Sequence, residues 1–344
     1  MNSPQAKPRR LRGNFTLALV ATVIVASLLP CRGQTAVTAD WIANIAISLL
    51  FFLHGAKLPR GAIVAGATHW RLHLVVLLST FGLFPLLGFA LKPVLSPLVT
   101  PALYTGVLFL CTLPSTVQSS IAFTSIAKGN VPAAVCSASA SSMIGIFLTP
   151  VIASVMIVNQ NAGSISSLHG VWNIVLELFV PFIAGQLLRP WIAGSLERRI
   201  SLLKYVDQGS ILLIVYTAFS EAVVEGLWHQ TPVAALGGLV VVDAVLLAAA
   251  LLVTGFAAKW LGFSKADQTT IVFCGSKKSL ASGIAVAKVL CPLHTVGAVV
   301  LPLMLFHQIQ LMVCAVLAQR WQTRNTRGEA KPPTASGPAT VDVR

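Results

Sequence analysis

Two polar segments interrupt long apolar stretches of this chain. Residues 113–130 read LPSTVQSSIAFTSIAKGN, and residues 273–290 read FCGSKKSLASGIAVAKVL. The two segments lie at corresponding positions in the two halves of the sequence. In hydrocarbon, irregular or polar backbone is tolerated only inside protein or beside a water-filled cavity. The pair therefore predicts two broken helices whose polar parts are enclosed by the rest of the fold.

The apolar stretches around these segments are long enough to cross a bilayer, which takes about 20 residues per helix. Hydrophobic residues make up 56% of the chain and charged residues 10%, against about 25% charged residues in soluble domains. We therefore predict an all-α, polytopic membrane protein. Its ten predicted spans are residues 14–30, 37–54, 71–92, 101–127, 132–157, 170–190, 206–224, 233–258, 268–290 and 295–318.

The basic residues favour one orientation of these spans. With a cytoplasmic N-terminus and alternating spans, the 24 Lys and Arg residues fall on the cytoplasmic side, with five exceptions. Arg32, Lys92 and Lys288 fall outside, and Lys277 and Lys278 fall within the ninth span. This positive-inside bias predicts an inner-membrane protein with both termini in the cytoplasm. The same bias accounts for the net charge of +14. We therefore expect membrane lipid, and not nucleic acid, as a partner.

Ten spans divide into two sets of five, and the second set must enter the membrane in the opposite orientation. This is the geometry of an inverted-topology repeat. The predicted organisation is a basic cytoplasmic segment (residues 1–13), a ten-helix domain (14–318, with repeats of about 14–157 and 170–318) and a disordered tail (319–344). The N-terminus mimics a signal peptide, but we interpret it as a retained first span.

The first polar segment contains a predicted helix break at Pro114, because proline removes a backbone donor and clashes with the preceding turn. A half-helix that starts after the break would offer free N–H groups to an anion, while the side-chain oxygens suit a cation. Packing between helices is the alternative role for such residues. The candidate binding residues here are Ser115, Thr116, Gln118, Ser119 and Ser120.

The second polar segment places Lys277 and Lys278 within an apolar span. A charged lysine near the bilayer centre costs at least about 2.5 kcal/mol, so it is rarely kept without a role. One of the two could instead extend to the interface. A buried lysine can serve as an anion ligand or as a proton carrier. The candidate residues are Gly275 (also the predicted break), Ser276, Lys277, Lys278 and Ser279.

Other polar residues fall at membrane depth. Ser137 and Ser141 share one face of the fifth span, and packing and site lining are equally good interpretations of that face. Glu221 and Glu225 could form an outer vestibule. Neither an HExxH, a GxSxG nor a Walker motif occurs in the sequence, so we expect no enzyme. Further polar residues are Glu177, Gln186, His307, Gln308 and Gln310.

Three stretches of this chain, FFLHGAKL, LPSTVQSSIAFTSIAKGNVPAA and CGSKKSLASGIA, resemble the bile acid:sodium symporter superfamily, most closely its bacterial sodium-dependent transporter branch. The resemblance implies a five-plus-five inverted repeat with a core and a panel domain. It also implies that the broken fourth and ninth helices cross near the midplane, and that alternating access couples sodium to organic-anion uptake. On the family pattern, Ser119 and Ser120 fall where a Ser-Asn pair helps to bind sodium.

This chain departs from the pattern at the ninth span. The sodium-binding symporters have a glutamate at the start of the crossing and a glutamine just after it. Here residues 273–278 contain no carboxylate, and lysines stand near the glutamine position. Because a cationic side chain can replace a bound cation electrostatically, coupling to protons through Lys277 or Lys278 is the alternative to coupling to sodium.

Together these features predict a secondary active transporter of a small organic anion, such as a bile-acid-like, carboxylated or sulfonated solute. No cofactor is expected beyond a sodium ion as coupling ion. Two other classes stay open: a membrane regulator or sensor that retains the fold without transport, and an integral membrane enzyme that acts on lipid.

Overall fold

The computed structural model describes residues 11–57, 69–158, 168–224, 226–291 and 293–329, and in these residues the regular elements are all helical, with no strand. In chain order they are α1 (Leu11–Leu28), α2 (Gln34–Lys57), α4 (Trp70–Leu78), the π-helical turn η2 (Ser79–Leu83), α5 (Phe84–Ala90), α6 (Lys92–Leu95), the 3-10 turn η3 (Ser96–Leu98), α7 (Pro101–Thr112), α8 (Gln118–Ile126), α9 (Val131–Val158), α10 (Leu168–Arg198), α11 (Ile200–Val224), α12 (Leu227–Gln230), α13 (Val233–Trp260), α14 (Lys265–Gly275), α15 (Leu280–Leu290) and α16 (Leu293–Glu329).

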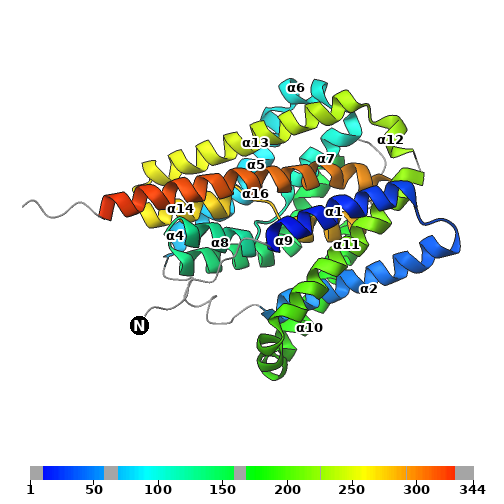
Figure 1. Cartoon of the computed structure of the whole chain (residues 1–344), viewed down its shortest axis with the longest axis horizontal. Helices are drawn as coiled ribbons and strands as arrows, with labels where there is room; N and C mark the ends of the chain where they lie inside the picture. Colours follow the sequence, from blue (N-terminus) through cyan, green and yellow to red (C-terminus); the bar gives the residue numbers. More distant parts are fainter. Residues whose placement is uncertain (1–10, 58–68, 159–167, 225, 292, 330–344) are drawn as a thin grey trace, which may run out of the picture.

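Each predicted span falls on one helix or on a run of consecutive helices, many of them elongated in the same general direction (Figure 1). Within the described residues, five helical stretches are long and apolar enough to cross a membrane: Gln34–Leu53, Trp70–Ala90, Val131–Ile157, Val233–Trp260 and Thr295–Gln322. On α13, the exposed Leu252, Phe256 and Trp260 repeat every four residues and form an apolar outer stripe, as a lipid-facing helix does. The protein is therefore a multi-pass membrane protein; the ten-span inverted repeat and the domain boundaries stay predictions.

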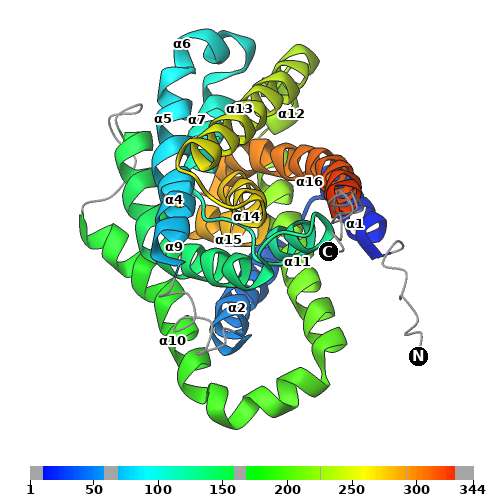
Figure 2. The ribbon, with the colours of Figure 1, turned by 90° about the vertical axis from the view of Figure 1, so that its left-hand side faces the viewer.

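The helices form two groups. Helices α1, α2, α10 and α11 form one chain of contacts, with α10 lying along α2, α2 along α11 and α11 along α1. We call them the four-helix group. The remaining long helices, α4, α5, α7 to α9 and α13 to α16, form the larger group. In Figure 2, α2 and α10 lie in the lower part of the molecule and α5, α7 and α13 in the upper part. Helices α11 and α16 join the two groups.

Two stretches inside the larger group are not helical, and both coincide with the polar segments of the sequence. Helix α7 stops at Thr112, and α8 begins at Gln118. Proline at position 114 explains this stop, because it cannot donate to the preceding turn. Helix α14 ends at Gly275, and α15 begins after Ser279, whose extended backbone and hydroxyl, which accepts a hydrogen bond from Ser282 N, form an N-cap.

The ends of the chain differ from the sequence-based assignment where they are described. Residues 11–13, assigned to the basic segment, already belong to α1, and residues 319–329, assigned to the disordered tail, continue α16. The extension has a local cause, since residues 319–327 contain good helix formers such as Gln and Arg and no proline or glycine. Residues 1–10 and 330–344 lie outside the described part of the chain.

Helices α2 and α10 approach each other at two glycines. A Cβ atom added to Gly185 would lie 2.0 Å from the backbone oxygen of Phe52, and one added to Gly55 would lie 2.0 Å from that of Phe182. Both contacts are with backbone, which cannot rotate away. Small residues therefore set the separation of this helix pair, as is common between membrane helices.

We predict that Gly185→Ala destabilises the protein by about 1–3 kcal/mol, because the added methyl group forces α2 and α10 apart. Thermal unfolding of the detergent-purified protein measures the effect. Gly237→Ala on α13 is the matched control, since its Cβ would meet no atom within 4 Å and alanine favours a helix over glycine. Equal unfolding temperatures for the two variants would contradict the prediction.

Candidate functional site

The hydroxyls that follow Pro114 hydrogen-bond to the C-terminal end of α14. Ser115 Oγ donates to the carbonyl oxygen of Cys274 at 2.5 Å, and Ser120 Oγ donates to that of Phe273 at 3.0 Å. The last carbonyls of a helix have no partner within the helix. The first polar segment thus satisfies the carbonyls that the end of α14 leaves free.

The two non-helical segments are also joined directly. The backbone N–H of Ser279 donates to the carbonyl oxygen of Pro114 at 2.9 Å, and the N–H of Ser115 donates to Ser141 Oγ of α9 at 3.0 Å. Gly145 on α9 makes room for the proline, because a Cβ there would lie 2.6 Å from Pro114 Cβ. Three parts of the chain that are distant in sequence therefore converge on one polar junction.

Lys278 lies at the centre of this junction and is fully buried. Its Nζ donates to the backbone oxygens of Thr80 (2.7 Å), Cys111 (2.9 Å) and Leu113 (2.7 Å), and it lies 4.2 Å from the centre of the Phe84 ring. An ammonium group has three N–H donors, so all three are used. Two of the acceptors lie at the C-terminal end of α7, where the helix dipole favours a cation.

Gln310 of α16 holds the backbone of the same lysine. Its Oε1 accepts from the N–H of Lys278 at 2.9 Å, and its Nε2 donates to the carbonyl oxygen of Lys278 at 2.9 Å and contacts His307 Nδ1 at 2.8 Å. One amide side chain thus serves both polar groups of a non-helical peptide unit. The sequence marked Gln310 as polar at membrane depth but did not assign it to the site.

Lys277 points to a different part of the junction. Its Nζ donates to the carbonyl oxygen of Ser119 at 2.9 Å and lies 4.0 Å from the ring centre of Phe123 and 5.4 Å from that of Phe273. Adjacent lysines therefore contact different elements, α8 for Lys277 and the end of α7 for Lys278. Carbonyl dipoles and ring faces stabilise an ammonium group without cancelling its net charge. The partners of Lys278 among the described residues are of this kind, so the junction suits an anion nearby.

The accessible part of the candidate site is small. Gln118 is exposed and Ser119 is half-buried, so the start of α8 is the accessible side of the junction. The hydroxyl of Thr116 lies 2.6 Å from that of Ser119 and 3.1 Å from that of Ser120. The other predicted residues are buried: Ser115, Thr116, Ser120, Ser137, Ser141, Gly275, Ser276, Lys277, Lys278 and Ser279.

The hydroxyl cluster around Ser119 and Ser120 offers oxygen ligands to a sodium ion but places them beside a cationic side chain. Three hydroxyl oxygens lie close together, and oxygen is the ligand that hard cations prefer. However, the Lys277 ammonium lies 2.9 Å from the backbone oxygen of Ser119 and repels a second cation at this range. The groups around Ser119 therefore favour the Lys277 ammonium over a bound sodium ion as the cation at this point.

Some sequence candidates lie apart from the junction or are occupied within their own helix. Ser137 Oγ lies 2.6 Å from His73 Nδ1, and Ser276 Oγ donates to the carbonyl oxygen of Val272 at 2.6 Å. Glu221 lines a separate pocket. Residue Glu225 and the side chain of Glu177 lie outside the described part of the structure.

The structure also reveals a buried acid that the sequence analysis passed over. Asp243 lies in the middle of α13 and is fully buried, and neither carboxyl oxygen has a hydrogen-bond partner among the described residues. A single acidic residue within a 28-residue apolar helix is the signal that could have identified it. Ionisable groups at such positions are functional candidates by default.

Comparisons with known proteins agree with the membrane architecture. The family model described as the SBF-like CPA transporter family matches residues 13–323. A Pseudomonas aeruginosa protein named "Uncharacterized protein PA2026" is 62% identical over 334 residues, which cover 97% of this chain and 99% of that protein. "Putative symporter YfeH" of Escherichia coli is 53% identical over 325 residues, covering 94% and 96%. Mouse "Sodium/bile acid cotransporter 7" is 26% identical over 326 residues, covering 91% and 94%. The family description and the latter two names denote transporters and not enzymes.

We predict that Gln310→Leu lowers the free energy of unfolding by about 2–4 kcal/mol, because it leaves the buried N–H and C=O of Lys278 without partners, at about 1–3 kcal/mol each. Chemical unfolding in mixed micelles measures the loss. Met312→Leu, an exposed position on the same helix, serves as the control and should match the wild type. Wild-type stability in Gln310→Leu would show that the amide does not support the junction.

Proposed function

This chain belongs to the SBF-like CPA transporter family, and on that premise we propose that it is a secondary active transporter of a small organic anion. The names of its relatives, symporter and sodium/bile acid cotransporter, support solute transport. A bile-acid-like or other carboxylated or sulfonated solute is the substrate class. The observation that carries this choice is the buried Lys278 ammonium, which within the described part of the chain hydrogen-bonds only to neutral backbone carbonyls and so leaves positive charge at the junction.

The solute would bind where the two non-helical segments meet. Helices α8 and α15 begin there, and the N-terminus of a helix favours an anion through its free N–H groups and dipole. Gln118 and Ser119 offer the accessible polar groups, with Lys277 beneath them. The proposed site residues are those of the sequence analysis, with Gln310 added as the residue that positions Lys278.

Transport would follow alternating access, with the larger helix group moving against the four-helix group. The proposed frame is ten spans in a five-plus-five inverted repeat, with the broken helices crossing near the midplane. The segregation of basic residues supports an inner-membrane location with both termini in the cytoplasm.

For the coupling ion we propose protons, with Lys277 and Lys278 as the internal cations. Their ammonium groups already occupy carbonyl oxygens at the junction, and a lysine can release its proton when buried. Sodium is the second candidate, favoured by the name of the mouse relative and by the hydroxyl cluster around Ser119.

Thermal stability of the purified protein distinguishes these two coupling ions. A ligand that binds only the folded state raises its apparent stability. We expect equal unfolding temperatures in sodium chloride and in equimolar choline chloride, and a dependence on pH between 6 and 8. A sodium-specific rise would reject proton coupling and direct attention to Ser119 and Ser120.

We predict that Lys277→Ala weakens binding of taurocholate, a sulfonated bile-acid probe, by at least about tenfold, or about 1.4 kcal/mol, without unfolding the protein. Equilibrium binding to the purified variant measures this, and Lys259→Ala, an exposed lysine on α13, is the control. Unchanged affinity in a folded Lys277→Ala variant would exclude Lys277 as the charge that binds the anion.

A further inference from the structure

A pocket of about 650 Å³ opens at the end of the molecule where α1 turns into α2. Its volume is in the range of small-molecule sites. Apolar side chains (Val37, Trp41 and Val224) line it together with polar ones, and it is separate from the junction around Lys278. Its polar lining residues are Arg32, Asp40, Thr217, Ser220 and Glu221.

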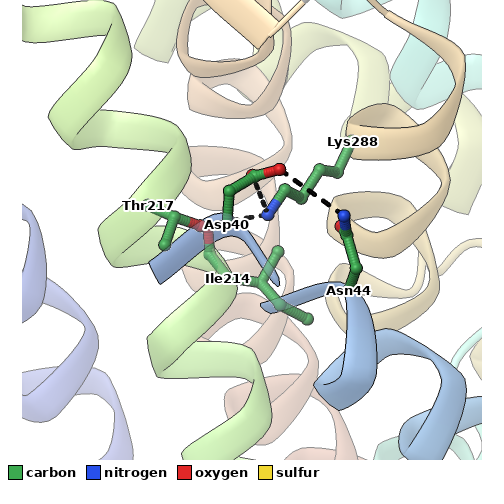
Figure 3. Close-up of polar contacts among 5 residues, drawn as sticks. All are labelled: Asp40, Asn44, Ile214, Thr217 and Lys288. Atoms are coloured by element: carbon green, nitrogen blue, oxygen red, sulfur yellow. Dashed lines mark hydrogen bonds and ion pairs between the residues drawn. The ribbon is translucent and has the colours of Figure 1, made fainter. Parts of the chain in front are cut away.

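A buried ion pair forms part of this region. Lys288 of α15 places Nζ 2.7 Å from Asp40 Oδ1 of α2 and 3.4 Å from Thr217 Oγ1 of α11. The lysine side chain is only 2% exposed, whereas that of Asp40 is 32% exposed. Figure 3 shows Lys288 reaching across to Asp40, with Asn44 on the other side of the carboxylate. Asp40 thus stands between the pocket, which it lines, and the lysine.

The ion pair joins the two helix groups. Asp40 belongs to the four-helix group, and Lys288 lies two turns from the start of α15, the helix that continues from the Lys277 and Lys278 segment. If the two groups move relative to each other, Asp40 and Lys288 must separate. Removing the partner of a buried ion pair is strongly unfavourable, so an anion that takes the place of Asp40 would stabilise the separated state.

We propose that this pocket is an outer binding site for the anionic solute, whose carboxylate or sulfonate displaces Asp40 from Lys288. The apolar lining would hold the body of the solute, and the exchange of partners would release α15 from α2. The inference rests on the proposed transport of an organic anion, and it adds a second site that the solute occupies before it reaches the junction.

A cysteine in the pocket tests whether Lys288 can attract an anion there. Ser220→Cys places a thiol in the lining, one turn from Thr217, and Cys31→Ser removes the native thiol that lines the same pocket. The rates of modification by the sulfonate reagent methanethiosulfonate ethylsulfonate and by its trimethylammonium counterpart are compared, with the same chain lacking Ser220→Cys as background.

We expect Asp40→Asn to raise the ratio of sulfonate to ammonium rates at least tenfold, because Lys288 then faces the pocket without a counter-ion. Lys288→Met should lower the ratio by a similar factor, since Asp40 then remains without its cationic partner. Asn44 contacts Asp40 but carries no charge, so Asn44→Ala should leave the ratio unchanged. If either single variant fails to fold, exchanging the two charges (Asp40→Lys with Lys288→Asp) keeps the pair. The buried partner at position 288 is then an acid, so the ligand that displaces residue 40 must be a cation, and the ammonium reagent should be favoured.

An unchanged ratio in both Asp40→Asn and Lys288→Met would overturn the outer site. The junction gives an independent result: if Lys277→Ala still weakens taurocholate binding, the proposed function survives the loss of the outer site. If neither the ratio nor taurocholate binding responds, both proposals are rejected.

Discussion

Every backbone polar group at membrane depth must find a partner inside the protein, and the organisation of this chain follows from that requirement. Stopping α7 at Thr112 and α14 at Gly275 frees several carbonyls in an apolar setting. Serine hydroxyls donate to the carbonyls at the end of α14, and the ammonium group of Lys278 donates to those at the end of α7. Gln310 pairs with the buried, non-helical peptide groups of Lys278. The polar residues of the two segments are therefore first of all the means by which the interruptions exist.

The same network has an electrostatic result. Carbonyl oxygens satisfy the hydrogen bonds of an ammonium group but leave its charge in place, whereas a carboxylate would satisfy both. Lys278 has carbonyl partners and Lys288 has a carboxylate partner. The first lysine thus contributes net positive charge to the junction, while the second is neutralised until Asp40 leaves. Lys278 therefore favours an anion whenever it is protonated, whereas Lys288 does so only when Asp40 has left.

Much of the fold could be predicted from local sequence, because apolar runs of bilayer length and the proline at position 114 act through neighbouring residues. The sequence analysis also allowed Lys277 and Lys278 different surroundings, since one of the two could extend to the interface. Their partners could not be predicted, because backbone carbonyls carry no residue-specific signal. Lys288 was counted among the outside charges, since charge counting treats each basic residue separately and cannot detect Asp40, which is distant in sequence. The deep acid Asp243 was missed although a single carboxylate inside an apolar span is itself a signal of a functional position. Residues 319–329, assigned to the tail, continue α16, because a helix can extend past the end of an apolar run.

The three carbonyl oxygens that accept from Lys278 precede it in the chain, and this order bears on how the lysine enters the membrane. Thr80, Cys111 and Leu113, whose carbonyl oxygens accept from Lys278, belong to the first half of the chain. They are therefore synthesised well before the lysine. A segment that enters the bilayer with two lysines faces about 2.5–3.5 kcal/mol for each unless acceptors are present. The acceptors of Lys278 all lie in the first half of the chain, and a C-terminal half expressed by itself would lack them.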